Sequence, residues 1–486
     1  MSKQYDYVII GAGFAGMCMA IKLKQAGFHN FVILERNKQL GGTWYDNHYP
    51  GAACDVQSHL YSFSFEPNAN WSRMFGPQQE ILQYMEHCAT KYELRQHFQF
   101  NTTVTSATFN DTTNTWTVTD AQGNNYTAKA VIGCSGGLSQ PAMPDIKGMD
   151  TFAGKTFHSA QWDNSYDLKG KRVAIIGTGA SAIQIVPAIA EEVKELLLFQ
   201  RTPPWIMPKP DRKISSFEMK LFNAVPFMQR LYRSYLYWTH EAMAAGFVTN
   251  PAILRLAQGI SKRHLKKAVK DEALRAKLTP TYTMGCKRIL LSNNYYPALT
   301  RSNVQVLNNG IAEINTIGVK TIDGTQHDVD AIIYATGFHA ADGVMAFDIK
   351  GKNGLDIHQA WQQGAEAYLG TTVAGFPNLF LIVGPNTGLG HSSMILMIEA
   401  QVQYIMEGIK AMRANKWKTV EVKPEVQQQY NETIQRELAK TVWQSGGCVS
   451  WYQNKNGKNV TLYPGYTFTF IRRTKRFEAD KYHTVA

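Results

Sequence analysis

The distribution of apolar residues predicts the same supersecondary unit at two places in the chain. In the first, a largely apolar run at residues 5–10 leads directly into a glycine-rich turn at residues 11–16. Apolar positions then recur at helical spacing, and a second apolar run at residues 31–34 ends at Glu35. The order strand, glycine turn, helix and strand is typical of one half of a dinucleotide-binding fold.

The second unit begins with the apolar run at residues 173–176 and the turn at residues 177–182. We expect a helix from Ala182 to Glu191 and a strand at residues 196–199. Glycines in such a turn let backbone N–H groups approach a pyrophosphate at the start of the helix. We therefore predict an α/β fold with two interleaved Rossmann-like domains. The turn positions expected to contact the two dinucleotides are Gly11, Gly13, Gly16, Gly177, Gly179 and Ser181.

The residue that ends the second strand differs between the two units. Glu35 lies 24 positions after Gly11, and Arg201 lies 24 positions after Gly177. An acid at this position accepts hydrogen bonds from an unmodified ribose, whereas an arginine pairs with a 2′-phosphate. We therefore predict FAD at the first site and NADPH at the second, so that electrons flow from a nicotinamide to a flavin. A surface ion pair is the alternative for Arg201.

Length and composition fit a globular enzyme. The 486 residues are enough for two or three domains, and 44% of them are hydrophobic and 18% charged. No apolar run approaches the ~20 residues that a membrane-spanning helix needs. The first strand begins so early that we expect no signal peptide and a cytoplasmic protein.

Charge and cysteines restrict the function classes further. The net charge is +12, with many basic residues at 262–277, but no nucleic-acid motif accompanies them, so a solvated helical face is favoured. The cysteines are scattered and contain no CxxC pair, which argues against zinc and against a flavin disulfide reductase. We interpret them as buried free thiols. They are Cys18, Cys54, Cys88, Cys134, Cys286 and Cys448.

Two further stretches have a more specific pattern. Residues 41–55 read GGTWYDNHYPGAACD, and residues 152–163 read FAGKTFHSAQWD. Here the chain resembles the type I Baeyer–Villiger monooxygenases, whose fingerprints are GGxWxxxxYPGxxxD and FxGxxxHxxxW followed by Pro or Asp. Residues 335–337 resemble the ATG element of the wider flavin monooxygenases. The end at residues 450–452 (SWY) is most similar to the 4-hydroxyacetophenone monooxygenase branch.

The resemblance implies a reaction. NADPH would reduce FAD, and the reduced flavin with O2 would give a C4a-peroxyflavin. Its peroxide anion would attack a ketone carbonyl, and rearrangement would give an ester or lactone. Sulfoxidation is implied as a side activity.

The resemblance also implies residue roles. The segment that contains Lys287 and Arg288 is similar to the family's KR segment, so Arg288 would be the catalytic guanidinium and Lys287 a contact to the 2′-phosphate. An arginine suits the first role because it stays charged at neutral pH. Asp55 would hold Arg288, and Trp451 would contact the NADP ribose from a mobile loop whose hinge is at residues 446–447.

The remaining candidates fall into two groups. Those expected to contact a cofactor are Glu35, Gly42, Thr43, Trp44, Asp55, Tyr61, Arg201, Thr202, Lys287, Ala335, Thr336, Gly337, Asn386 and Trp451. Those expected to hold the two domains in register are Phe152, Gly154, His158 and Trp162. For His158 direct chemistry is the alternative, and we interpret Phe152 and Trp162 as core anchors.

We divide the chain into three parts. The FAD domain is expected at residues 1–140 and 377–486, and the NADP domain at residues 151–204 and 303–375. Residues 205–302 are expected to form a helical insertion that also carries the Arg288 segment. Within it, we interpret the apolar positions as helix core, with a surface-seeking amphipathic helix as the alternative. These positions are Leu231, Tyr232, Tyr235 and Trp238.

Two other functions remain open. One is an N- or S-oxygenating flavin monooxygenase, which usually lacks the Trp-Asp ending found at residues 162–163. The other is an NADPH oxidase that releases hydrogen peroxide. The expected partners are a small ketone or sulfide and O2, with no nucleic acid, no membrane span and no metal, in a monomer or weak homo-oligomer.

Overall fold

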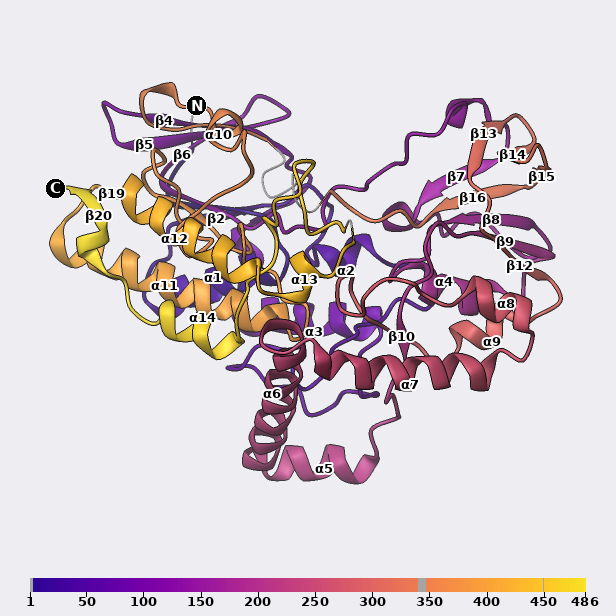
Figure 1. The fold of residues 1–486 in the computed structure, drawn as a ribbon. Coiled ribbons are helices and arrows are strands. Elements are labelled where there is room, and N and C mark those ends of the chain that lie inside the picture. The colour runs from indigo at the N-terminus through magenta and orange to yellow at the C-terminus, as the bar shows by residue number, and fades with distance from the viewer. Residues whose placement is uncertain (1–2, 340–346, 449) are drawn as a thin grey trace.

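Two sheet-containing halves lie side by side, and a group of helices projects below them (Figure 1). The computed structural model describes residues 3–339, 347–448 and 450–486. Each half contains one of the two glycine turns recognised in the sequence. The prediction of an α/β fold with two Rossmann-like halves and a helical insertion is confirmed.

The first half is built on a large mixed sheet with the strand order β17-β4-β5-β6-β1-β2-β3, and β18 lies beside β6. Alternate residues of β1 face opposite sides of this sheet, as strand geometry requires. Ile9 packs with helices α1 and α11, whereas Val8 packs in the core of the other face. The elements of this half up to residue 133 are β1 (Lys3–Ile10), α1 (Phe14–Gln25), β2 (Phe31–Leu34), α2 (Thr43–Asp46), α3 (Gln78–Lys91), β3 (Phe98–Gln99), β4 (Val104–Asn110), β5 (Thr115–Asp120) and β6 (Asn125–Gly133).

The second half is built on a parallel sheet with the order β12-β9-β8-β16-β7. Its central strands β9, β8 and β16 are short and mostly apolar, as expected for a sheet covered on both faces, whereas the edge strand β7 is mostly polar. A small antiparallel sheet, β13-β14-β15, is attached to it. The elements are β7 (Lys155–His158), β8 (Arg172–Ile176), α4 (Ala182–Ile189), β9 (Glu195–Phe199), α9 (Tyr295–Leu299), β12 (Val304–Leu307), β13 (Ile311–Asn315), β14 (Gly318–Thr321), β15 (Gln326–Asp328) and β16 (Ala331–Tyr334).

Strand pairing corrects one expected domain boundary. Strand β17 (Asp348–Lys350) pairs with β4 and therefore belongs to the sheet of the first half. The expectation that the second domain continues through residue 375 is wrong at this edge, because a three-residue strand gives no signal of its partner. The remaining elements are α10 (Ile357–Ala360), β18 (Leu379–Leu381), α11 (Met394–Asn415), β19 (Thr419–Val422), α12 (Pro424–Leu438), α13 (Val442–Ser445), α14 (Thr467–Arg473) and β20 (Tyr482–Val485).

The segment between the two parts of the second half is helical. Helix α5 begins with a capping box in which Ser215 and Glu218 bond reciprocally, and Pro226 begins α6. Strand β10 precedes these helices in the chain and β11 follows them, and the two strands pair with each other. The elements are β10 (Ile206–Met207), α5 (Ser216–Ala224), α6 (Pro226–Val248), α7 (Ala252–Ala268), α8 (Glu272–Lys277) and β11 (Leu290–Leu291). Within the described residues, no helix is long and apolar enough to cross a membrane.

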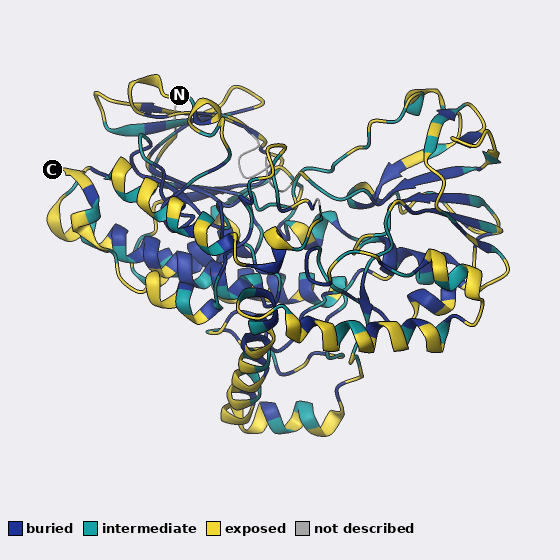
Figure 2. Cartoon of the chain, viewed as in Figure 1, coloured by how far each residue is buried: buried dark blue, intermediate teal, exposed yellow. Residues whose placement is uncertain are grey.

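The expected burial of the apolar positions on α6 is wrong for three of the four. Leu231, Tyr235 and Trp238 are 48%, 63% and 56% exposed, whereas Tyr232 is half-buried and packs against the core. Figure 2 shows the outward side of α6 as largely exposed. Helical periodicity identifies a face but not the side that meets the core, and here the inward face is centred on Leu236 instead.

The interpretation of all six cysteines as free thiols is also wrong for two of them. Cys286 and Cys448 form a disulfide, with Cα atoms 6.2 Å apart and 162 positions between them in sequence. Spacing along the chain cannot reveal a pair that the fold brings together. The other four cysteines are buried and free, as expected: Cys18, Cys54, Cys88 and Cys134.

The disulfide makes a direct prediction about thiol content. Protein denatured without reductant should react with four equivalents of Ellman's reagent, and with six after reduction by dithiothreitol. The double variant Cys286→Ser, Cys448→Ser should give four in both conditions. Six reactive thiols in freshly purified, unreduced wild-type protein would show that the pair is not oxidised.

Candidate functional site

The first glycine turn is shaped to leave backbone N–H groups accessible. Gly11 has φ of +108°, and a Cβ there would lie 2.7 Å from the carbonyl oxygen of Cys134. A Cβ on Gly16 would lie only 1.9 Å from the oxygen of Gly11. Gly13 caps α1 without any side-chain hydrogen bond. The start of α1 can therefore receive an anion, because its first N–H groups have no partner within the helix.

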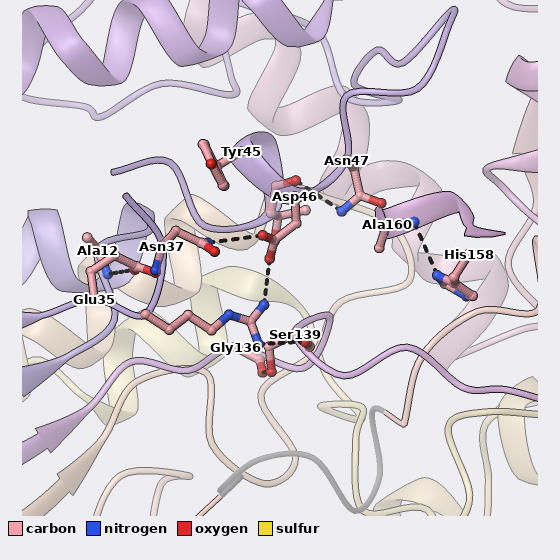
Figure 3. A network of polar contacts seen from close by, with 12 residues as sticks. Ala12, Glu35, Asn37, Tyr45, Asp46, Asn47, Gly136, Ser139, His158 and Ala160 are labelled. Atoms are coloured by element: carbon pink, nitrogen blue, oxygen red, sulfur yellow. Dashed lines mark hydrogen bonds and ion pairs between the residues drawn. The ribbon is translucent and has the colours of Figure 1, made fainter. Parts of the chain in front are cut away.

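Glu35 holds this turn in place. Its Oε2 accepts from the backbone nitrogen of Ala12 at 2.7 Å, and its Oε1 accepts from that of Asn37 at 2.9 Å (Figure 3). Burial raises the pKa of Glu35, and the two backbone hydrogen bonds oppose this rise. The predicted contact of Glu35 with a ribose remains a prediction, because the structure contains no ligand.

Glu35 is connected to the first fingerprint through Arg36 and Asp46. Arg36 Nη2 pairs with Asp46 Oδ2 at 2.7 Å, and Arg36 Nη1 donates to the carbonyl oxygen of Ser139 at 3.0 Å. Asn37 Nδ2 donates to the other carboxylate oxygen of Asp46 at 3.0 Å. These contacts anchor α2 beside the first dinucleotide position. Sequence reasoning missed Arg36, which has no motif signal of its own.

The candidates at the start of α2 lie against the glycine turn. A Cβ on Gly42 would lie 2.9 Å from Gly13 Cα, and Gly42 has φ of +51°. Thr43 is the first residue of α2, and Trp44 donates its Nε1–H to Tyr61 Oη at 3.0 Å. The fingerprint glycine is therefore required by a close backbone approach as well as by its φ.

The first fingerprint also contacts the second half of the molecule. His48 has its Nε2 3.1 Å from the carbonyl oxygen of Trp162, in the second fingerprint. Tyr49 Oη donates to Gln184 Oε1 at 2.9 Å, and Gln184 Nε2 donates to the carbonyl oxygen of Ala53 at 2.9 Å. The two fingerprints thus meet. His48 occupies a variable position of its motif, so the motif did not single it out.

The second fingerprint is a packed joint. A Cβ on Gly154 would lie 2.5 Å from the ring of Phe152, so this position needs glycine. The ring of Trp162 is buried against Phe157, with centroids 4.9 Å apart. His158 is buried, and its Nδ1 accepts from the backbone nitrogen of Ala160 at 3.1 Å. Burial lowers the pKa of His158, so its ring is neutral at pH 7.

The second glycine turn lies against the ATG element. A Cβ on Gly177 would lie 2.4 Å from the carbonyl oxygen of Ala335, whereas a Cβ on Gly179 would meet nothing within 4 Å. Ser181 begins α4 without a side-chain cap. Thr336 Oγ1 donates to the carbonyl oxygen of Ala142 at 2.6 Å, so this element is tied to the linker before residue 151. Gly337, with φ of +87°, accepts from the backbone nitrogen of the same residue, Ala142.

Two cations lie together beside this turn. Arg201 is exposed and follows β9, and Lys287 is half-buried. Burial lowers the pKa of Lys287, and the positive charge of Arg201 lowers it further. Thr202 follows Arg201 directly and lies beside the glycine turn, since its carbonyl oxygen accepts from Thr178 Oγ1 at 3.1 Å. Two like charges in proximity favour binding of an anion such as a phosphate.

Asp55 and Arg288 form an ion pair at the junction of the two halves. Arg288 donates through Nε at 3.0 Å and through Nη2 at 2.6 Å to the same oxygen, Asp55 Oδ2. About a third of each side chain is exposed, 35% for Arg288 and 29% for Asp55. Burial alone would raise the pKa of Asp55, but the charges of Arg288 and Lys209 outweigh it and the pKa is lowered. Asp55 itself raises the pKa of Arg288.

Lys209 is a second cation near this pair. Its Nζ donates to the carbonyl oxygen of Cys54 at 3.3 Å and lies 4.7 Å from the centre of the Phe75 ring. Burial lowers the pKa of Lys209, and the negative charges of Asp211 and Asp55 oppose this. Sequence reasoning missed Lys209 because only the fold brings β10 next to the first fingerprint.

The C-terminal loop reaches the same place through Tyr452. Tyr452 is buried and its pKa is raised to about 12 by burial, with the charge of Arg288 lowering it and that of Asp55 raising it. Trp451, predicted to contact the NADP ribose, is 41% exposed and packs on Tyr452 with ring centroids 4.6 Å apart. Tyr452 is therefore a residue of this loop near the ion pair. The contact of Trp451 with the NADP ribose remains a prediction.

The expected hinge of this loop is constrained. The Cα of Gly446 packs so closely on Cys286 that a Cβ would lie 2.7 Å from the Cβ of Cys286. The Cys286–Cys448 disulfide then joins the loop to the segment of Arg288. Asn386 holds the far end of the loop, because its Nδ2 donates to the carbonyl oxygens of Asn459 and Leu462. Its predicted cofactor contact remains a prediction.

Comparisons with known proteins agree with this arrangement. A family model described as pyridine nucleotide-disulphide oxidoreductase matches residues 8–225. The four cysteines of that range are all free, and the one disulfide among the described residues lies outside it. A protein named Baeyer–Villiger monooxygenase from Pseudomonas aeruginosa is 50% identical over 99% of this chain and 92% of its own length. Another from Streptomyces coelicolor is 46% identical over 98% and 92%.

Solved structures show the same likeness. A closed crystal structure of cyclohexanone monooxygenase superposes with a TM-score of 0.91, at 30% identity and full coverage of both chains. Cyclohexanone monooxygenase from Rhodococcus sp. Phi1 bound to NADP+ superposes with a TM-score of 0.90, also at 30% identity and full coverage.

The buried histidines near the site predict a pH dependence of stability. Burial, together with the positive charge of a protonated His240, lowers the pKa of His391 to about 4. An unfolded histidine has a pKa of about 6.5, so the unfolded chain binds this proton first. The contribution of His391 to the free energy of unfolding is therefore fully present above about pH 6.5. It is lost as the pH falls from there towards 4.

Replacing this histidine should make stability less sensitive to acid. In His391→Gln, the drop in unfolding free energy between about pH 7.5 and 5 should be smaller than in the wild type by up to about 2 kcal/mol. Urea titrations at the two pH values measure it. The exposed histidine variant His29→Gln is the control. An unchanged drop in His391→Gln would contradict the prediction.

Proposed function

The chain belongs to the Baeyer–Villiger monooxygenase family, and from this we infer that it is an FAD- and NADPH-dependent enzyme that inserts one oxygen atom of O2 next to a ketone carbonyl. The product is an ester or a lactone. The observation that carries the proposal is the Asp55–Arg288 ion pair, which lies where the two nucleotide folds meet. Sulfides are proposed as secondary substrates.

The residues present fit both cofactors. Two helices begin with uncapped glycine turns whose N–H groups suit a pyrophosphate. The open space at Gly179 and the close approach of Gly42 to Gly13 leave no side chain between backbone and ligand. We propose that Glu35 accepts hydrogen bonds from the FAD ribose. We also propose that Arg201, Thr202 and Lys287 bind the 2′-phosphate of NADPH. When bound, NADPH supplies a hydride and FAD supplies the activation of O2.

Arg288 is proposed as the catalytic residue. Its Nε and Nη2 both bind Asp55, and no further hydrogen bond of this guanidinium is found within the described residues. Nη1 can therefore donate to the ketone oxygen as negative charge develops on it. Asp55 is a positioning residue that fixes the guanidinium and keeps it charged.

The surroundings of the pair support this role. Lys209 adds positive potential beside the pair, and the buried Tyr452 lies near it. The joint formed by His48 and Trp162 sets the distance between the two folds. We propose that Phe152, Gly154 and His158 act through this joint and not on the reacting atoms.

A stoichiometry experiment tests the function. FAD-loaded enzyme is mixed with NADPH and O2, and NADPH consumption is compared with product formed from panels of ketones and sulfides. Ester or lactone formed in proportion to NADPH consumed supports the proposal. Sulfoxide alone would favour an N- or S-oxygenating enzyme, and hydrogen peroxide in stoichiometric yield with every compound would favour an oxidase.

Arg288→Ala should separate the two half-reactions. It should still allow reduction of FAD by NADPH in stopped-flow traces, because the hydride transfer does not need the guanidinium at the ketone. Ester formation should fall by at least about a hundredfold, the scale found when one donor to a developing oxyanion is removed. Arg212→Ala, which breaks a surface ion pair with Glu218, is the matched control. Ester formation at the wild-type rate in Arg288→Ala would refute the assignment.

Arg201→Ala should change coenzyme preference. The loss of one charge-assisted hydrogen bond costs about 1.5–3 kcal/mol, which corresponds to a rise of about tenfold to a hundredfold in KM for NADPH. KM for NADH should hardly change, since NADH has no 2′-phosphate. Arg301→Ala, which removes an arginine paired with Glu191 on the same half, is the control. Equal effects on both coenzymes would show that Arg201 does not bind the phosphate.

A further inference from the structure

The positive charge of the protein is concentrated in one segment. Residues 212–270, which we call the helical arm, contain eleven Lys and Arg residues and two Glu residues, whereas the whole chain has a net charge of +12. Neither of the two acids offers a free carboxylate at the surface. Glu218 is paired with Arg212, and Glu241 is buried and accepts from the backbone nitrogen of Thr467.

The same segment exposes an unusual amount of apolar side chain. More than half of the large apolar residues that are exposed within the described residues belong to the helical arm. Single exposed apolar residues are normal, but a contiguous group marks an interaction surface. The group is Phe217, Val225, Phe227, Met228, Leu231, Tyr235, Trp238, Met243, Ile253, Leu256 and Ile260.

These residues have a definite geometry. The junction of α5 and α6, residues 223–228, which we call the α5–α6 turn, is exposed at every position. It ends with Phe227 and Met228 in the first turn of α6. From Phe227, exposed apolar residues follow α6 at intervals of four, four and three positions, through Leu231, Tyr235 and Trp238. Such spacing places them on one face of the helix.

The opposite face of α6 contacts the protein through polar groups. Arg233 Nη1 donates to the carbonyl oxygen of His59 at 2.7 Å, and His240 Nε2 lies 2.6 Å from Gln57 Oε1. Leu236 is buried between them. Tyr232 and Tyr237 also pack against the core on this side. The helix therefore has enough inward contacts to hold it in place, and folding alone does not require that Tyr235 and Trp238 face outward.

The arm projects from the body of the molecule. Figure 1 shows α5 and the lower end of α6 below the two sheet-containing halves, with the α5–α6 turn at the extremity. Figure 2 shows this region as mainly exposed. A flat surface can therefore reach the turn and the outer face of α6 without touching the nucleotide folds.

We propose that the helical arm docks the enzyme on membranes that contain anionic lipids, with the α5–α6 turn and the outer face of α6 in the headgroup region. Trp and Tyr favour this region, and Phe, Leu and Met enter the acyl boundary below it. Lys220 and Arg230 flank the turn and can contact lipid phosphates, while the lysines of α7 add longer-range attraction.

The positive charge of the helical arm, together with its exposed apolar residues, favours an anionic bilayer over a second copy of the chain or a nucleic acid. A second copy of the chain would bring two strongly basic arms together, which costs free energy. A nucleic acid would use the basic residues but would leave the apolar turn exposed. An anionic bilayer can bind the basic residues through its phosphates and bury the apolar residues at its acyl boundary. The docking itself does not depend on the reaction proposed above.

Vesicle flotation with the FAD-loaded enzyme tests the proposal. Phosphatidylcholine vesicles with about a quarter phosphatidylglycerol should carry at least about tenfold more enzyme than pure phosphatidylcholine vesicles at about 0.1 M salt. Binding should weaken as salt is raised. Equal recovery with both vesicle types, or none with either, would overturn the proposal.

Two variants separate the apolar and electrostatic contributions. Phe227→Ser with Met228→Ser and, separately, Lys220→Glu with Arg230→Glu should each lower binding to anionic vesicles at least about fivefold. Their controls are Ile322→Ser, at an exposed apolar position outside the arm, and Lys194→Glu with Lys350→Glu, which make the same charge change elsewhere. All variants should retain FAD, which verifies folding.

The controls also discriminate a protein partner. If the wild type sediments as a dimer, the Phe227→Ser, Met228→Ser variant as a monomer, and neither floats with vesicles, the surface binds a second copy and the membrane proposal is refuted. If the control variants lose binding as strongly as the arm variants, the attraction is non-specific and the proposal is also refuted.

Discussion

The Asp55–Arg288 ion pair is the interaction on which the proposed chemistry depends. Its members come from different parts of the fold: Asp55 ends the first fingerprint, and Arg288 lies near the end of the helical insertion, 233 positions later. A guanidinium left alone in a half-buried site would lose hydration without compensation. The carboxylate supplies that compensation through two hydrogen bonds and leaves one edge of the guanidinium for a ligand. The same contact thus fixes the position of the Arg288 guanidinium and keeps it charged.

The rest of the site ensures that these two segments meet. His48 joins the fingerprints, and Gln184 ties the first of them to the helix that follows the second glycine turn. The contacts are single hydrogen bonds between backbone and side chain, and each contributes modestly on its own. Together they connect the two nucleotide folds at several points around Asp55. A family fingerprint is, in this protein, largely a description of the surfaces by which two domains touch.

Local physics made part of this structure predictable from the sequence. The glycine turns, their helices and the Glu35–Arg201 contrast follow from steric rules that operate within about thirty residues. The pairing of Asp55 with Arg288 came from family resemblance, and the structure brings the two together. Where no family resemblance was used, predictions that depended on long-range proximity failed: Cys286 and Cys448 were interpreted as free, and Tyr235 and Trp238 as core. Periodicity defines a helix face, but only the tertiary fold decides what that face meets.

The disulfide gives the molecule two covalent forms. In the oxidised form, the segment before Arg288 and the loop before Tyr452 are one cross-linked unit, so the C-terminal loop cannot move far from the guanidinium. In the reduced form, only non-covalent contacts restrict that movement. Dithiothreitol in a purification buffer therefore selects which form is studied. Rates measured with and without it describe enzymes that differ in how freely the C-terminal loop moves beside Arg288.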